Sequence, residues 1–558
     1  VVIGIFFLAL IGIIVWVVRQ KQNDSADYFL GGRDATWLAI GASIFASNIG
    51  SEHLIGLAGA GASSGMAMAH WEIQGWMILI LGWVFVPFYS RSMVYTMPEF
   101  LERRYNPQSR TILSVISLVS YVLTKVAVTV YAGGLVFQQV FGIKELWGID
   151  FFWIAAIGLV VLTALYTIFG GMKSVLYTSV LQTPILLLGS LIILVLGFKE
   201  LGGWDEMMRV CGAVTVNDYG DTMTNLIRSN DDANFPWLGA LIGSAIIGFW
   251  YWCTDQFIVQ RVLSGKNEKE ARRGTIFGAY LKLLPVFLFL IPGMIAFALH
   301  QKYIGAGGEG FLPMLANGTA NADAAFPTLV AKLLPAGVKG LVVCGILAAL
   351  MSSLASLFNS SAMLFTIDFY KRFRPETPEK KLVGIGQIAT VVIVILGILW
   401  IPIMRSVGDV LYTYLQDVQS VLAPGIAAAF LLGICWKRTS AQGGMWGLIA
   451  GMIIGLTRLG AKVYYSNAGE VADSTFKYLF YDMNWLFFCG WMFLFCIIVV
   501  IVVSLATEAP TAEKIQGLVF GTATKEQKAA TRASWDHWDI IHTVIILAIT
   551  GAFYWYFW

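Results

Sequence analysis

The sequence has little charge. Only 13% of its 558 residues are Asp, Glu, Lys or Arg, against about 25% in an average soluble domain. Hydrophobic residues make up 58% of the chain, and the mean hydropathy is +0.72. This balance excludes an ordinary soluble protein and indicates an integral membrane protein. The net charge is only +3, which gives no sign of nucleic-acid binding, so we expect no nucleic-acid partner.

Cysteine and histidine are also sparse. The six cysteines stand singly, mostly inside apolar runs, so they predict neither a disulfide framework nor a metal centre. The five histidines are scattered along the chain, and no Ser/His/Asp set or cluster with metal-ligand spacing can be assembled from them. We therefore do not expect an enzyme.

Apolar runs are what the sequence has in abundance. Runs near twenty residues predict roughly fourteen membrane-spanning helices. The first run lacks a basic leader and a cleavage site, so we interpret it as a spanning helix rather than a signal peptide. The predicted helices cover residues 3–18, 36–58, 70–90, 111–141, 151–169, 174–196, 237–258, 274–300, 338–366, 383–403, 409–435, 443–459, 484–506 and 538–557.

Basic residues favour one orientation of these helices. If the loop after the first helix is cytoplasmic, the inner loops collect most of the Lys and Arg, as the positive-inside rule requires. Both termini are then expected outside the cell membrane. The longest outer loops, 197–236 and 301–337, are candidate caps over an entrance, and the inner segment 507–537 shows no chemical motif.

The stretch 41–60 is apolar enough to cross a bilayer, yet its middle reads ASNIGSEH. Unpaired backbone groups cost several kcal/mol in hydrocarbon, so irregular backbone survives only inside protein or beside a watery cavity. We predict a helix broken near Asn48 to Gly50, whose free carbonyls and half-helix ends can hold ions and solute. The alternative is that Gly and Ser serve only close helix packing here.

A second interruption is expected at 243–248, GSAIIG, followed by Phe249 to Trp252. It comes five predicted helices after the first. Interrupted helices in corresponding positions are typical of paired repeats of opposite orientation with a binding site between them. We expect these repeats to be the second to sixth and the seventh to eleventh helices.

Three polar side chains stand in apolar helices: Glu72, Lys282 and Gln416. A charge at the bilayer centre costs at least about 2.5 kcal/mol, so such groups normally face a cavity or a partner. One carboxylate, one ammonium, the amides of Asn48 and Gln416, and His53 would suit a neutral solute rich in hydroxyls. The alternative is that Glu72 and Lys282 only neutralise each other.

Aromatic residues beside these groups could cover the flat face of a sugar ring or act as gates. For any one aromatic in a chain with 14% of them, core packing is the competing interpretation. The candidates are Trp71, Tyr251, Trp252 and Tyr412.

Adjacent serines, Ser352 and Ser353, lie in the apolar run 338–366. Serines in such a helix often donate to the preceding turn. Alternatively, their hydroxyls face the break near Asn48 and, with its carbonyls, supply the neutral oxygens that a hard cation prefers. Sodium fits that set of ligands.

Several long stretches resemble the sodium/glucose (galactose) branch of the solute:sodium symporter family. They are GASIFASNIGSEHLIGLAG, GWVFVP, YTMPEFLERRY, FWYWCTDQFIVQR, AYLKLLP, MSSLASLFNSSAMLFTIDFY and PGIAAAFLLGICWKR. The resemblance implies an all-α membrane protein of the LeuT type, with five-plus-five inverted helices and extra helices at the ends. It divides the chain into 1–35, a first repeat over 36–200, an outer loop over 201–236, a second repeat over 237–436 and terminal helices over 437–558.

The resemblance also implies a site in which the family's ligands fall on matching positions. Sodium would be held by the carbonyls of Ala46, Ile49 and Ala349 and the hydroxyls of Ser352 and Ser353. The sugar would contact Asn48, His53, Glu72, Trp252, Lys282 and Gln416, with Tyr251 as an inner aromatic gate and Trp71 and Tyr412 as outer ones. These are expectations from the resemblance.

Two positions depart from the family pattern. Ser179 stands where relatives have an aspartate near a second sodium position, so we expect one sodium per sugar. Gly248 stands where a bacterial relative offers an asparagine to the sugar. The resulting hypothesis is sodium-driven import of a monosaccharide such as glucose or galactose by alternating access.

Other functions stay open at this point. Another polyol such as inositol, or a sugar acid such as sialic acid, would use a similar site. A sugar sensor without transport would need an output partner, and a channel or uniporter would show a sodium leak or no coupling. The sequence does not indicate an oligomeric state.

Overall fold

The computed structural model describes residues 1–20, 24–50, 52–315, 318–405, 411–467 and 472–558, with side chains at all of these except 123, 124, 139, 336, 403–405, 411–415, 466 and 467. Within this part, the chain is helical apart from a hairpin of β1 (Glu145–Leu146) and β2 (Ile149–Asp150), isolated bridges and loops. Eleven of the described helices are long and apolar enough to cross a membrane. The fold is that of an all-α, multi-pass membrane protein.

The predicted helix count of roughly fourteen stays a prediction. The eleven spans include α11 (Phe151–Leu201) as a single helix of 51 residues, although its backbone turns at Gly171 with φ 52° and ψ −146°. The predicted runs 151–169 and 174–196 meet at this turn. A side chain at Gly171 would collide with the Tyr28 carbonyl. Two further apolar segments, Trp37–Asn48 and Ala127–Gln138, are shorter than a full span.

The first half of the chain contains the predicted helix break. Helix α3 (Trp37–Asn48) ends at Asn48, a π-helical turn η2 (Glu52–Leu57) follows, and α4 (Ala58–Ser64) continues the path. The other helical elements before the β hairpin are α1 (Val2–Arg19), α2 (Ser25–Leu30), η1 (Gly31–Arg33), η3 (Gly65–Met68), α5 (Ala69–Glu72), α6 (Gly75–Ile80), η4 (Leu81–Phe85), α7 (Val86–Ser92), α8 (Met97–Arg104), α9 (Pro107–Ser120), η5 (Tyr121–Val126) and α10 (Ala127–Phe141).

The second break does not lie where the sequence predicted it. Residues 243–248 are helical within α13 (Trp237–Gly248), and a π-helical turn η6 (Phe249–Thr254) follows. The backbone becomes extended only at Asp255, before α14 (Gln256–Leu263). The glycines serve packing instead, because a Cβ at Gly243 would lie 2.9 Å from Leu486 Cδ2.

The rest of the second half is built from long helices. They are α15 (Glu268–Lys282), α16 (Ile291–Gly305), α18 (Ala336–Met363), α20 (Glu379–Arg405), α21 (Leu411–Cys435), α22 (Ala441–Asn467), α24 (Trp485–Ala506) and α27 (His537–Tyr556). Short helical turns between them are η7 (Val286–Leu290), η8 (Ala322–Ala324), η9 (Leu364–Tyr370), α19 (Lys371–Phe373), α23 (Thr475–Lys477) and η10 (Tyr478–Asp482). The broken helix α3 packs against α11, α15 and α18, so its polar end is surrounded by protein.

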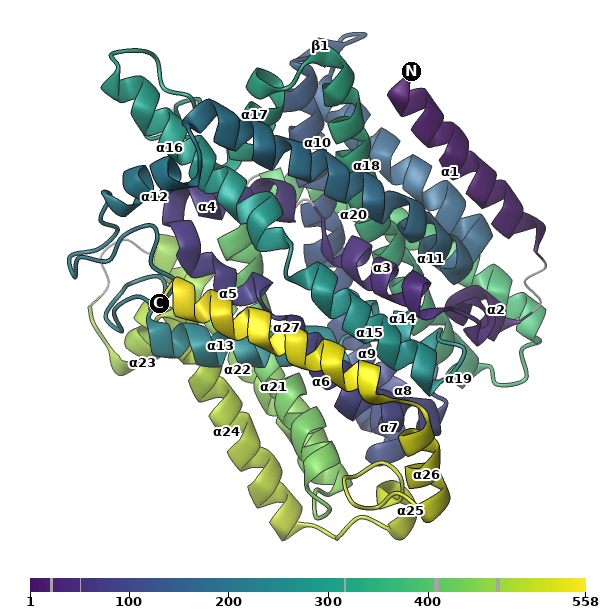
Figure 1. Ribbon diagram of the computed structural model, residues 1–558. Coiled ribbons are helices and arrows are strands. Elements are labelled where there is room, and N and C mark those ends of the chain that lie inside the picture. Colours follow the sequence, from purple (N-terminus) through teal and green to yellow (C-terminus); the bar gives the residue numbers. More distant parts are fainter. Residues whose placement is uncertain (21–23, 51, 316–317, 406–410, 468–471) are drawn as a thin grey trace.

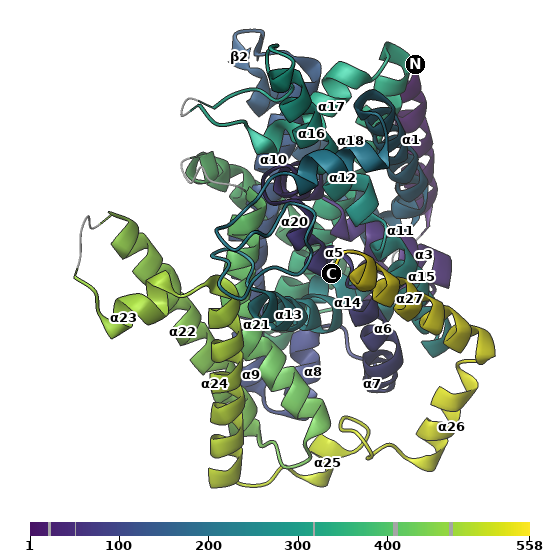
Figure 2. The ribbon, with the colours of Figure 1, turned by 60° about the vertical axis from the view of Figure 1, so that its left-hand side comes forward.

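Helices at the two ends of the chain lie at the periphery. Figures 1 and 2 show α1 along one edge, α27 across an outer face, and α22 and α24 beside each other at another edge. The predicted loops contain short helices, α12 (Trp204–Gly212), α17 (Ala325–Leu333), α25 (Ala512–Ile515) and α26 (Lys525–Ala533). The sidedness of the termini and the boundaries of the repeats stay predictions.

Close contact between α4 and α16 depends on glycine. A Cβ at Gly293 would collide with the carbonyl oxygen of Ala58. We expect Gly293→Ala to force the two helices apart and to lower stability by roughly 1–3 kcal/mol. Gly551→Ala is the control, because that position has no neighbour within 4 Å and alanine favours helix. Thermal unfolding of the purified proteins in detergent tests this, and equal melting temperatures for the two variants would contradict it.

Candidate functional site

The break after α3 leaves main-chain oxygens without helical partners. Ile49 is extended, with φ −80° and ψ 107°. The amides of His53 and Leu54 both donate to the Gly50 carbonyl, at 3.1 and 3.3 Å. No donor among the described residues reaches the carbonyls of Ala46 or Ile49. Within the described residues these two oxygens, predicted as sodium ligands, are therefore unpaired at a helix end buried within the protein.

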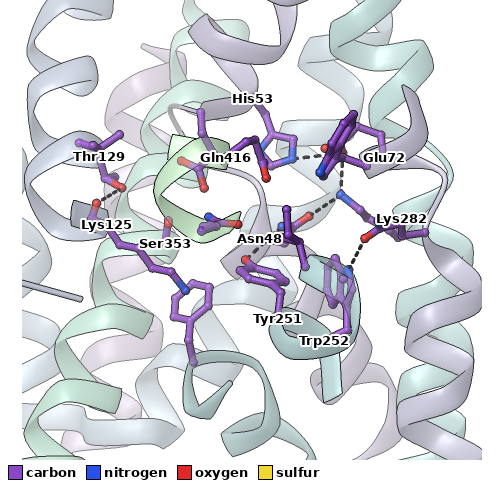
Figure 3. Close-up of a pocket in the computed structure, with 18 of the residues that line it drawn as sticks. Asn48, His53, Glu72, Lys125, Thr129, Tyr251, Trp252, Lys282, Ser353 and Gln416 are labelled. Carbon is purple, nitrogen blue, oxygen red and sulfur yellow. Dashed lines mark hydrogen bonds and ion pairs between the residues drawn. The ribbon is translucent and has the colours of Figure 1, made fainter. Parts of the chain in front are cut away.

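A chain of polar contacts extends from this break (Figure 3). Asn48 Nδ2 donates to the Tyr251 hydroxyl at 3.2 Å, and Lys282 Nζ donates to Asn48 Oδ1 at 3.1 Å. The same ammonium lies 2.6 Å from Glu72 Oε2. His53 Nε2 lies 3.2 Å from that carboxylate oxygen. Five residues predicted from distant parts of the sequence are thus brought together.

Because these polar contacts are buried, losing one of them is expected to cost stability. The side chains of Glu72 and Lys282 are 2% and 4% exposed. Two buried charges are tolerated when they are paired and hydrogen-bonded, whereas loss of one partner leaves the other uncompensated. Lys282 also binds Asn48 beside the break, so the pair belongs to a larger set of contacts, and its role toward a solute stays a prediction.

All of these groups line one cavity. Its aromatic surfaces include Trp71, Tyr251 and Trp252, and Lys282 Nζ lies 5.3 Å from the centre of a Trp252 ring. Trp252 Nε1 donates to Gln74 Oε1 at 3.3 Å. The cavity therefore combines flat apolar faces with fixed polar groups, the combination that a small-molecule site requires.

Gln416 reaches the same cavity from α21. It is 7% exposed, and its Oε1 has no hydrogen-bond partner among the described residues. An unpaired buried acceptor is available to a hydroxyl donor. Tyr412, the other predicted gate residue, falls outside the described side chains.

The predicted sodium serines lie against the broken helix. Ser47 Oγ and Ser356 Oγ are 2.6 Å apart and join α3 to α18. Ser352 and Ser353, one turn earlier on α18, are each 1% exposed, and Ser353 lines the cavity. Ser356 donates to the Ser352 carbonyl, whereas within the described part of the chain neither the Ser352 nor the Ser353 hydroxyl donates to the preceding turn. Ala349 lies on the same helix one turn before Ser353.

Ser179 lies beside these residues. Its hydroxyl is 3.3 Å from Ser352 Oγ and 3.5 Å from Ser43 Oγ, and it donates to the Val175 carbonyl at 2.6 Å. The place where relatives were expected to have a carboxylate is thus a cluster of neutral hydroxyls. Gly248, the other departure, lies against the Gln74 amide, so the backbone there leaves room for that side chain.

The sequence analysis missed a second ion pair at the cavity. Lys125 lines the cavity, and its ammonium is 2.6 Å from Asp255 Oδ2. Asp255 also accepts from the Tyr121 hydroxyl. Lys125 lies within 5.3 Å of the ring centres of Tyr121, Trp250, Tyr251 and Phe257. A lysine inside the predicted apolar helix 111–141 was a usable signal, of the same kind that identified Lys282.

Glu52 is another cavity residue that was not selected. It directly precedes His53 at the start of η2. From its position in the sequence, Glu52 was expected in the polar middle of the broken helix, but no role was predicted for it. Its carboxylate adds acceptor oxygens to the wall that already contains Glu72.

A profile of the sodium:solute symporter family matches residues 28–451, a range that includes both helix breaks and every residue described above as lining the cavity. The chain belongs to the sodium:solute symporter family. It is therefore a sodium-coupled membrane transporter, and sodium is its co-transported ion.

Curated relatives of this symporter are named for a cyclic polyol. It is 36% identical over 535 residues to "Sodium/myo-inositol cotransporter 2" of Homo sapiens, covering 93% of this chain and 78% of the relative. It is 37% identical over 544 residues to "Sodium/myo-inositol cotransporter" of Canis lupus familiaris, covering 93% and 74%. The expected glucose/galactose branch is thus not supported, and the alternative polyol is favoured.

A solved structure shares the fold of this symporter. The outward-open, substrate-bound Na⁺-coupled sialic acid symporter aligns with a TM-score of 0.72 at 22% identity, covering 91% of this chain and 98% of that one. The predicted LeuT-type architecture is confirmed at the level of fold. The assignment of individual site residues stays a prediction.

Removing one charge of the buried pair tests how the cavity of this symporter is stabilised. We expect Lys282→Met to destabilise the protein by roughly 3–5 kcal/mol, because Glu72 loses its cation. Adding Glu72→Gln should recover part of the loss. Lys371→Met is the control, since its pair with Glu379 is 34% and 45% exposed and contributes at most about 1 kcal/mol. Melting temperatures measure all variants; a double mutant less stable than Lys282→Met would contradict the expectation.

Proposed function

We propose that this symporter imports a neutral, hydroxyl-rich ring solute of the inositol type, coupled to sodium. The observation that supports it most directly is that both lysines of the cavity already have an anionic partner. Lys282 is bound to Glu72 and Asn48, and Lys125 is bound to Asp255. Neither described ammonium is left over for an anionic solute.

An acidic sugar such as sialic acid therefore fits this cavity poorly. A carboxylate brought beside Glu72 would meet a like charge, and its desolvation would lack a compensating cation. A hydroxyl, by contrast, can donate to Glu72 or Gln416 and accept from the Lys282 ammonium or the Asn48 amide. Neutral polyols make use of both kinds of partner.

A cyclic solute also suits the aromatic walls. Trp71, Tyr251 and Trp252 offer flat faces to the C–H side of a ring, while the polar groups reach its hydroxyls. Glu52 adds acceptors to this wall. An inositol carries a hydroxyl donor at every ring position, and glucose has one ring oxygen that can only accept. The acceptor-rich wall and the names of the relatives together favour the cyclitol.

Coupling would pass through the broken helix. We assign sodium to the carbonyls of Ala46, Ile49 and Ala349 and the hydroxyls of Ser352 and Ser353. Sodium bound there would join α3 to α18 and fix Asn48 and His53 for the solute. Coupling is then the difference in solute affinity between the sodium-bound and sodium-free protein. With hydroxyls rather than a carboxylate at Ser179, we propose one sodium per solute.

The roles of the remaining residues follow the same scheme. The solute would contact Asn48, His53, Glu72, Trp252, Lys282 and Gln416, with Tyr251 on the inner side and Trp71 and Tyr412 on the outer side. The two predicted repeats, 36–200 and 237–436, would move relative to each other around this site. One sodium would provide about 2.3 kcal/mol per 100 mV and about 1.4 kcal/mol per tenfold gradient.

Uptake into liposomes tests the proposed solute. We expect labelled myo-inositol to accumulate with an inward sodium gradient and to stop accumulating when potassium replaces sodium. Unlabelled glucose and sialic acid should compete more weakly, because one has fewer donors and the other carries a charge. The ratio of sodium to solute flux should be near one. Accumulation of glucose with no inositol uptake would reject the solute, and sodium-independent uptake would reject the coupling.

Removing a single hydroxyl tests the proposed sodium ligands. We expect Ser353→Ala to raise the sodium concentration for half-maximal uptake by roughly tenfold, the effect of losing about 1.4 kcal/mol of cation binding. Ser361→Ala on the same helix is the control, since Ser361 is buried outside the cavity. Sodium titration of uptake, with protein amount normalised, measures both. An unchanged sodium dependence in Ser353→Ala would remove this residue from the site.

A further inference from the structure

The indole of Trp71 separates the cavity from a second tryptophan. Trp71 lines the cavity, is 4% exposed, and its Nε1 has no hydrogen-bond partner among the described residues. It is stacked on Trp485, with ring centres 5.5 Å apart and an interplanar angle of 23°. Trp485 is the first residue of α24, a helix outside both predicted repeats. It is 9% exposed.

A third aromatic ring, that of Phe235, adds to the stack of Trp71 and Trp485. We call these three rings the roof of the cavity. Phe235, from the loop before α13, meets Trp71 edge to face at 6.2 Å and 69°. The Arg228 guanidinium lies 5.6 Å from the centre of the Phe235 ring. Arg228 also donates to the Ser64 carbonyl at the end of α4. The roof therefore joins α5, α24 and the outer loop.

Trp485 is held in place by neighbours on both sides. The Asn484 side chain accepts from the Leu486 amide at 2.9 Å and donates to the Ala233 carbonyl at 2.7 Å, which ties the start of α24 to the outer loop. Leu486 packs against Gly239 and Gly243 of α13 without room for a side chain there. Helix α13 leads directly into η6, which carries Tyr251 and Trp252.

We propose that Trp485 is a positioning residue of the outer lid, whose indole holds Trp71 flat over the solute. The peripheral helix α24 then takes part in solute occlusion. For Trp71 to swing away and admit solute, it must leave the stack with Trp485, so the stack favours the closed lid. The inference rests on the proposed solute cavity, but not on the identity of the solute.

Accessibility of the cavity from outside tests this without any solute. Thr129 lines the cavity and is 2% exposed, so Thr129→Cys serves as the probe for a membrane-impermeant thiol reagent, with labelling of the unmodified protein subtracted. Aromatic stacking contributes about 0.5–1.5 kcal/mol beyond area burial. We therefore expect Trp485→Ala to raise the labelling rate of the Thr129→Cys probe roughly two- to tenfold.

Two further variants separate a lid effect from a folding effect. Trp485→Leu keeps an apolar side chain without the flat ring, so it should also raise labelling, whereas Trp485→Phe should restore most of the closed lid. Trp491→Ala is the matched control, because this tryptophan on α24 is 63% exposed. The proposal would be overturned if a folded Trp485→Leu protein were labelled at the parent rate. It would also be overturned if Trp491→Ala raised the labelling rate as much as Trp485→Ala does.

Transport adds a readout that distinguishes this proposal from the proposed function. In liposomes, Trp485→Ala should raise KM for the transported solute several-fold while its sodium dependence is retained. If no polyol is transported but labelling still rises, the proposed solute fails and the lid stands. If the polyol is transported by Trp485→Ala with parental KM and labelling, the lid fails and the proposed function stands.

Discussion

The structure depends on one constraint, which is that a backbone polar group without a partner is tolerated in a membrane only when protein surrounds it. Helix α3 ends within the bundle, where α11, α15 and α18 enclose it. Its last residues, Ala46 to Asn48, are all buried. Because the surrounding helices exclude lipid, the break can expose the carbonyls of Ala46 and Ile49 to a cation instead of to hydrocarbon.

The same enclosure explains the paired charges. A cavity for a polar solute needs hydrogen-bonding side chains, and in a bundle each charge among them needs a partner. Lys282 meets this need by binding Glu72 and Asn48 together. Asn48 in turn binds Tyr251 of the other broken segment. One continuous set of contacts therefore links the first break to the segment that precedes the second.

Sequence patterns located the first break and the polar residues because a polar group inside a long apolar run has few physical explanations. They misplaced the second break because glycine occurs both where a helix is interrupted and where two helices pack closely. Gly243 is of the second kind, since it lies against Leu486 within a continuous helix. The turn occurs at Asp255, whose side chain caps α14. Lys125 was missed although it obeyed the same rule as Lys282. The choice of inositol over glucose as the proposed solute rests mainly on the names of the relatives rather than on any single residue.

The cavity is bounded by two different kinds of contact. Beside Tyr251, Lys125 and Asp255 form an ion pair between η5 and the start of α14, so separation there would expose two charges. At Trp71 the roof is a stack of neutral rings, whose separation would cost apolar and ring-stacking contacts but would separate no ion pair. Both boundaries contact the segment from α13 through η6 to α14, the first through Asp255 and the second through the packing of α24 on α13. Movement of this one segment would therefore alter both boundaries of the cavity at once.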